Sequence, residues 1–228
     1  MGIILKETLI IFLERFIMMM KTFYISFQGV KTMININKIK VAGFRNLKEV
    51  EIETENITSL LSINSYGKSN FLNAIIFGFN FIHLPLELKN RMMDYDSYKP
   101  FNSKNLLNDF QFEVDLSYEE KGKKLQINYG YSFEWKKKEE VEPKIVYEYL
   151  KIKDDNSQKY AQYINRTFDK ATYKSSPTGA CNKKIKIENN ELVINKIMAY
   201  DELYYLDLIK TLNNINVYVD KHFNTNAK

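Results

Sequence analysis

The chain has 228 residues, which is enough for one substantial domain, alone or with a smaller appendage. Hydrophobic residues at 45 % and charged residues at 27 % are typical of a soluble globular protein. The 33 basic and 28 acidic residues give a net charge of +5, which is too small to indicate a nucleic-acid partner by itself. The single cysteine, Cys181, excludes an intrachain disulfide framework and fits a reducing cytoplasm.

The first 32 residues form a leader whose composition differs from the rest. Its two apolar runs, 9–13 and 16–20, are flanked or interrupted by charged residues. Neither run approaches the roughly 18 apolar residues of a membrane span, and no secretory cleavage site is clear. We therefore expect a cytoplasmic protein without a membrane anchor. One interpretation is that translation begins at Met33, where a regular strand pattern starts.

The segment 33–90 has the pattern of a nucleotide-binding core. Alternating apolar residues predict strands over 34–41 and around 50–52, with a turn at Gly43-Phe44-Arg45-Asn46 between them. The largely apolar run 57–63 is typical of a buried parallel strand. Helical spacing of apolar residues then predicts a helix from Lys68 to about His83.

The segments that follow have a different period. Within 91–153, apolar and aromatic residues alternate over 110–118, 125–133 and 145–152, which predicts an antiparallel β meander inserted after the core. Its aromatic stripe either packs the sheet onto a neighbouring layer or forms a platform for stacking bases. Within 154–228 we expect a polar loop, a short hairpin around Asn189-Asn190 and a final amphipathic helix over 203–212.

The stretch from Ser62 to Ser69 follows the P-loop pattern G-x-x-x-x-G-K-[ST] in its second half. Gly67, Lys68 and Ser69 match, whereas Ser62 replaces the first glycine and Tyr66 adds a bulky ring. A lysine at a helix start is unfavourable beside the partial positive charge of the helix end, and a bound phosphate removes that conflict. The alternative interpretation is a structural strand-turn-helix corner that carries a lysine.

A family resemblance rests on two stretches. The Phe44-Arg45 pair within 39–48, followed by an Asn-Ile-Thr strand and a loop with Gly-Lys-Ser-Asn, resembles the start of RecF/SMC-like ATPases. These are ABC-type heads that also occur in AAA-family ATPases of bacterial defence and in proteins of the overcoming-lysogenization-defect type. The resemblance covers Met33 to about Ile152. It implies an α/β fold, the N-terminal lobe of a P-loop NTPase with an antiparallel β-rich insertion and a C-terminal helix.

The same resemblance implies ATP and Mg²⁺ as ligands. Lys68 would contact the β- and γ-phosphates, Ser69 would ligate Mg²⁺, and Arg45 would lie near the nucleotide. The loop itself would be shaped by Asn64, Gly67 and Asn70. ABC-type heads hydrolyse ATP between two subunits, so a homodimer or a partner ATPase or nuclease subunit is expected.

The catalytic half of such a head is not evident, and we assign no catalytic residue. The chain contains no Ser-Gly-Gly signature. The run 197–202 has the outline of an apolar strand ending in Asp201-Glu202, which would hold Mg²⁺ through water and polarise the attacking water. Asp201 is equally a helix N-cap. His83 is interpreted as structural, and His222 falls loosely where a switch histidine would lie.

Two functional hypotheses follow. The first is an ATP-binding head, truncated or short, that depends on another chain for ATP hydrolysis in a DNA-related or phage-defence setting. The second is a degenerate, non-hydrolysing interaction or nucleic-acid-binding module that keeps the fold without the nucleotide.

Overall fold

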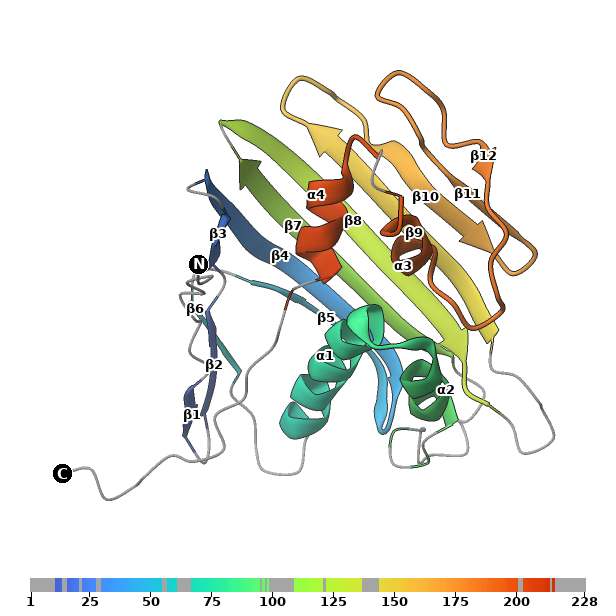
Figure 1. Ribbon diagram of the computed structural model, residues 1–228. Helices are drawn as coiled ribbons and strands as arrows, with labels where there is room; N and C mark the ends of the chain where they lie inside the picture. The colour runs from blue at the N-terminus through green and yellow to red at the C-terminus, as the bar shows by residue number, and fades with distance from the viewer. Residues whose placement is uncertain are drawn as a thin grey trace.

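The computed structural model is dominated by one large antiparallel sheet with helices on one of its faces (Figure 1). The structure describes these parts of the chain: 11–13, 16–20, 22–27, 30–54, 57–60, 67–94, 96, 98, 109–120, 122–136, 144–200, 203–213 and 215.

The large sheet has nine strands. Eight lie in the order β12-β11-β10-β9-β8-β7-β4-β3, and β5 also pairs with β4. Their bounds are β3 (Thr22–Phe27), β4 (Val30–Phe44), β5 (Leu47–Glu53), β7 (Phe110–Glu120), β8 (Lys123–Glu134), β9 (Lys144–Asp154), β10 (Ala161–Thr167), β11 (Lys170–Tyr173) and β12 (Lys183–Lys184). A separate three-stranded sheet contains β1 (Ile11–Leu13), β2 (Phe16–Met20) and β6 (Ile57–Leu60). Every pair of strands in both sheets is antiparallel.

Four described helices cover one face of the large sheet (Figure 1). They are α1 (Lys68–His83), α2 (Leu86–Asp94), α3 (Val193–Ile197) and α4 (Leu206–Asn213). None of the helices in the described ranges is long and apolar enough to cross a membrane.

The sheet has one buried face because apolar and polar residues alternate along its central strands. Phe110, Phe112 and Val114 of β7 are buried, whereas the residues between them are only half-buried. The two phenylalanine rings of β7 meet α1: the Phe77 ring lies 4.8 Å from the Phe110 ring, and the Phe79 ring lies 5.0 Å from the Phe112 ring, between centroids. The predicted meander and the predicted helix are both confirmed.

The contact between α1 and β7 is unusually close. A Cβ atom at Gly78 would lie 2.1 Å from Cδ2 of Phe112, so glycine is required for the helix to reach this depth. The Tyr131 hydroxyl of β8 donates a 2.8 Å hydrogen bond to the Gly78 carbonyl. Close packing and this bond together set the position of α1, and therefore of its N-terminus, above the sheet.

The predicted α/β P-loop NTPase fold is wrong. The strand expected over 57–63 is β6, and it pairs antiparallel with β2 rather than lying in a parallel core sheet. Parallel pairing needs a second strand that returns through a crossover connection. In the described chain the segment after α1 instead enters α2 and then the antiparallel meander of β7, β8 and β9.

Other expectations also fail after residue 154. The polar loop contains two paired strands, β10 and β11, that the sequence pattern did not indicate. The hairpin expected around Asn189-Asn190 is absent from this described stretch, which leads from β12 into α3. The alternative of an apolar strand before Asp201 is not formed, because Ile197 ends α3 and a turn follows.

Candidate phosphate-binding site at the N-terminus of α1

The motif glycine stands at the N-cap of α1. Gly67 has φ 97° and ψ 1°, a left-handed conformation that strongly favours glycine. Its carbonyl accepts the 2.8 Å hydrogen bond from the Phe71 N–H that begins the helix. Gly67 offers no side chain to cap the helix, and the first turn carries no acidic residue. Among the described residues, this helix end therefore has neither a side-chain cap nor a first-turn carboxylate to balance its partial positive charge.

The turn between β4 and β5 lies directly against this helix end. A Cβ atom at Gly67 would lie 3.5 Å from the Leu47 side chain and 3.6 Å from Nδ2 of Asn46. Asn70, in the first turn of α1, donates a 2.6 Å hydrogen bond from Nδ2 to Oδ1 of Asn46. Arg45 donates a 3.0 Å bond from Nη1 to Oδ1 of Asn70. We call Arg45, Asn46 and Asn70 the turn cluster.

Two aromatic rings hold the Arg45 guanidinium in place. Its central carbon lies 5.6 Å from the centroid of the Phe44 ring and 5.8 Å from that of Tyr98. The backbone of the turn is also fixed, because Arg45 N–H donates to the Tyr98 carbonyl and Trp135 Nε1 donates to the Gly43 carbonyl. Arg45 itself has φ 49°, which is uncommon for a residue with a side chain.

The electrostatics of this corner favour an anion. The guanidinium of Arg45 is bonded to the first turn of α1, where the helix already carries partial positive charge. Lys68 is the first residue of the helix. The Arg45 guanidinium and the helix end are both positive, and an anion placed beside them would offset this charge.

The structure brings together three of the predicted site residues: Arg45, Gly67 and Asn70. Ser69 is exposed in the first turn of α1, and Lys68 begins the helix, although its side chain is not among those described. The loop residue Asn64 lies outside the described residues. Asp201, Glu202 and His222 also lie outside them.

Sequence reasoning missed the role of Asn46. It treated Asn46 only as a turn residue, yet Asn46 accepts the hydrogen bond that connects the turn to Asn70. The sequence shows Asn46 after Phe44-Arg45 and Asn70 after Gly-Lys-Ser, but it does not show that these two side chains lie within hydrogen-bonding distance.

A metal would have few protein ligands at this corner. Within the described ranges, no group of three or more His, Cys, Asp or Glu residues is arranged to hold a metal ion. Ser69 is the hydroxyl residue of the first turn, so a Mg²⁺ ion here would depend on phosphate and water oxygens for its other ligands.

His83, at the other end of α1, is half-buried, and burial together with the charge of Lys89 lowers its pKa.

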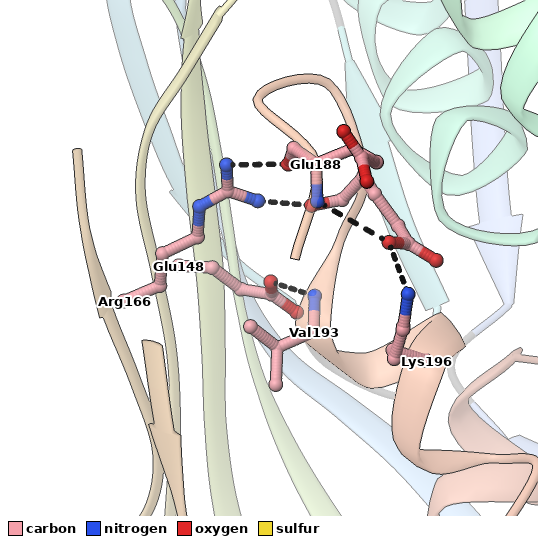
Figure 2. Close-up of polar contacts among 6 residues, drawn as sticks. Glu148, Arg166, Glu188, Val193 and Lys196 are labelled. Carbon is pink, nitrogen blue, oxygen red and sulfur yellow. Dashed lines mark hydrogen bonds and ion pairs between the residues drawn. The ribbon is translucent and has the colours of Figure 1, made fainter. Parts of the chain in front are cut away.

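A second group of charged residues is structural. Glu148 of β9 is fully buried and accepts a hydrogen bond from the Val193 N–H at the start of α3 (Figure 2). It also accepts one from the Ile194 N–H. Burial raises the pKa of this carboxyl, although these bonds oppose the effect. Arg166 of β10 donates to backbone carbonyls of the segment before α3, including that of Glu188. Both side chains are thus occupied with fixing α3 to the sheet.

No family model matches the chain, and the search of curated proteins finds no matching relative.

Proposed function

We propose that the chain binds the phosphates of ATP, together with Mg²⁺, at the N-terminus of α1. The observation that carries this proposal is the turn cluster: Arg45 is bonded to the first turn of a helix that begins with Gly67-Lys68-Ser69 and has no acidic residue there. Lys68 would contact the β- and γ-phosphates and Ser69 would ligate Mg²⁺, as the resemblance to RecF/SMC-like ATPases implies. The N–H groups of the helix end would face the phosphate oxygens.

Hydrolysis is proposed only with a contribution from another subunit. The resemblance implies hydrolysis between two subunits, and the sequence contains no Ser-Gly-Gly signature. A second copy of the chain, or a partner ATPase or nuclease subunit, would supply that group. Binding and turnover are therefore separate tests, and binding comes first.

The proposal is tested by equilibrium binding of a fluorescent ATP analogue with and without Mg²⁺. The Lys68→Ala variant should bind at least tenfold more weakly, because a charge-assisted contact to phosphate is lost. Lys48→Ala is the matched control, since Lys48 is an exposed lysine of β5 close in sequence to the turn cluster. Ser69→Ala should reduce the effect of Mg²⁺ on affinity. Equal retention of nucleotide by the wild type and Lys68→Ala would contradict the proposal.

Competition experiments separate the contribution of the adenine base to binding from that of the phosphates. Inorganic tripolyphosphate should displace the ATP analogue if phosphate contacts dominate, whereas adenosine should not. Displacement by adenosine alone would place the main contacts away from the helix end and would contradict the site.

One observation favours the second hypothesis, a nucleic-acid-binding module. Tyr147 and Tyr149 project from β9 on the face opposite Glu148, and their rings stack with centroids 6.0 Å apart and planes 19° apart. Lys151 Nζ lies 4.9 Å from the Tyr149 ring centroid. Stacked rings beside a cation are a usual platform for single-stranded nucleic acid.

The two hypotheses give opposite results in one experiment. Binding of single-stranded DNA that weakens with salt, is lost in Tyr149→Ala and is unchanged in Lys68→Ala would support the module. Binding of ATP that is lost only in Lys68→Ala supports the phosphate site. The Tyr147 hydroxyl donates to Glu113, so a carboxylate lies close to the platform and opposes a phosphate backbone there.

A further inference from the structure

A cavity of about 320 Å³ lies between α4 and the end of the large sheet at the β7–β8 turn. The turn cluster lies beyond the opposite end of β7, where Ala42 pairs with Gln111. Its floor includes Tyr118 of β7 and Leu125 of β8, which are cross-strand partners near the β7–β8 turn. This volume is near the lower limit of ligand pockets in proteins and suits a molecule with a single ring. The cavity is therefore independent of the proposed phosphate site.

Aromatic rings form one wall of the cavity. Tyr163 of β10 contacts Tyr204 and Tyr205, with ring centroids 5.9 Å and 5.1 Å away. Tyr204 and Tyr205 also pack edge to face on each other, at 4.8 Å. Such a wall favours a planar apolar group, which can pack against the face or edge of each ring.

The buried charge of the lining is a cation. Lys174 is 8 % exposed, and its Nζ lies 4.8 Å from the centroid of the Tyr163 ring. An ammonium group has three donors, yet none of the ion pairs or side-chain hydrogen bonds between described residues involves Lys174. The other buried lysine of the described chain, Lys89, donates to the Ile82 carbonyl and to Asn195. Lys174 thus lines the cavity with its ammonium against a ring and with no hydrogen-bond acceptor among the described residues.

The remaining charges of the lining lie at its edge or have other partners. Lys123 and Asp207 are exposed. Asp207 is in the first turn of α4, where a carboxylate is stabilised by the helix end. The Asp154 carboxylate accepts a 3.1 Å hydrogen bond from the Asn156 N–H within the turn that follows β9. None of these groups removes the need for an acceptor at Lys174.

We propose that this cavity binds a small aromatic carboxylate, with the carboxylate on Lys174 and the ring against Tyr163 and its neighbours. An anion in the cavity would accept hydrogen bonds from the Lys174 ammonium, which lines it and has no acceptor among the described residues. A cation is disfavoured, because Lys174 already occupies the face of Tyr163 that a cationic ligand would need.

The test uses 2-aminobenzoate, which is fluorescent, and its neutral amide, 2-aminobenzamide, which has nearly the same shape. The wild type should bind 2-aminobenzoate saturably with a dissociation constant below about 1 mM, and the amide at least about tenfold more weakly. Lys174→Met should weaken binding of the acid to about that of the amide and leave binding of the amide unchanged. Lys183→Met is the matched control: Lys183 is an exposed lysine that lies over the Tyr173 ring at 5.5 Å, and its loss should change nothing.

Three results would overturn the proposal: equal affinity of the wild type for acid and amide, no saturable binding of the acid, or tighter binding of choline than of 2-aminobenzoate. The comparison of acid and amide in the wild type decides the matter even if Lys174→Met does not fold. Binding of 2-aminobenzoate should be unchanged in Lys68→Ala and by saturating Mg²⁺-ATP. The failure of this proposal and the failure of the phosphate site are therefore distinguishable.

Discussion

Lys89 provides a quantitative test of the packing between α1, α2 and α3. Its side chain is 2 % exposed, and Nζ donates a 3.1 Å hydrogen bond to the Ile82 carbonyl at the end of α1. It also donates to Oδ1 of Asn195 in α3. Burial lowers the pKa of Lys89 from 10.5 to about 8, and the negative charges of Glu148 and Glu191 only partly oppose this effect.

The lowered pKa corresponds to about 3 kcal/mol between the charged and neutral forms. Because the pKa is lower in the folded chain, the unfolded chain binds more protons between about pH 8 and 10.5. The free energy of unfolding must therefore rise with pH between about pH 8 and 10.5. At pH 7 nearly all of the cost is present, and most of it should be recovered by pH 10.

The assay is urea unfolding of the wild type and of Lys89→Met at pH 7, 8, 9 and 10. The free energy of unfolding of the wild type, relative to the variant, should increase by about 2–3 kcal/mol from pH 7 to pH 10. The tyrosines titrate in both proteins alike, so their contribution to the pH dependence cancels in the comparison. The Ile82 carbonyl keeps a partner in the variant, because Asn195 Nδ2 donates to it at 2.7 Å.

Lys48→Met is the control, since Lys48 is exposed and should show no pH-dependent difference from the wild type. A difference between the wild type and Lys89→Met that stays constant within about 0.5 kcal/mol over the same range would refute the reasoning.

Three further substitutions test the packing and the candidate site. Gly78→Ala should lower the free energy of unfolding by about 1–3 kcal/mol because the new Cβ meets Phe112, although a glycine-to-alanine change usually stabilises a helix by about 1 kcal/mol. The control Asn73→Ala, at an exposed position of α1, should be near neutral, and a stabilised Gly78→Ala would show that α1 lies farther from β7. Tyr205→Phe removes a buried hydroxyl without a partner among the described residues, so its free energy of unfolding should be unchanged or higher by up to about 1 kcal/mol, and a clear loss would reveal a missing acceptor. Arg45→Gln should weaken ATP binding by about fivefold or more in the fluorescence assay while leaving unfolding by urea little changed, and undiminished affinity would exclude the guanidinium from the site.

Local patterns predicted the elements whose signals are local. Apolar spacing placed the helix from Lys68 to about His83, and α1 has those bounds. Alternation along 110–118 and 125–133 placed β7 and β8, because a half-buried strand repeats every two residues. The turn at Gly43–Asn46 likewise followed from its residue types and is confirmed by the β4–β5 pairing.

Patterns failed where the partner of a segment decides its structure. The run 57–63 was expected to be a parallel strand, yet an apolar run has the same composition whichever direction its neighbour takes, and β6 pairs antiparallel with β2. Strands β10 and β11 were not predicted, because the polar residues of this segment indicate a loop. They gain their place from pairing along the edge of β9.

The sequence by itself determined that a Gly-Lys-Ser-Asn stretch opens an amphipathic helix and that an aromatic-rich meander follows it. Both depend on the periodicity and backbone preferences of neighbouring residues. Only the tertiary structure decided that Arg45 and Asn46 meet Asn70, that Lys174 is buried without an acceptor in the described chain, and that the sheet is antiparallel throughout. These features join residues far apart in the chain, and their free energy comes from contacts that no local pattern encodes.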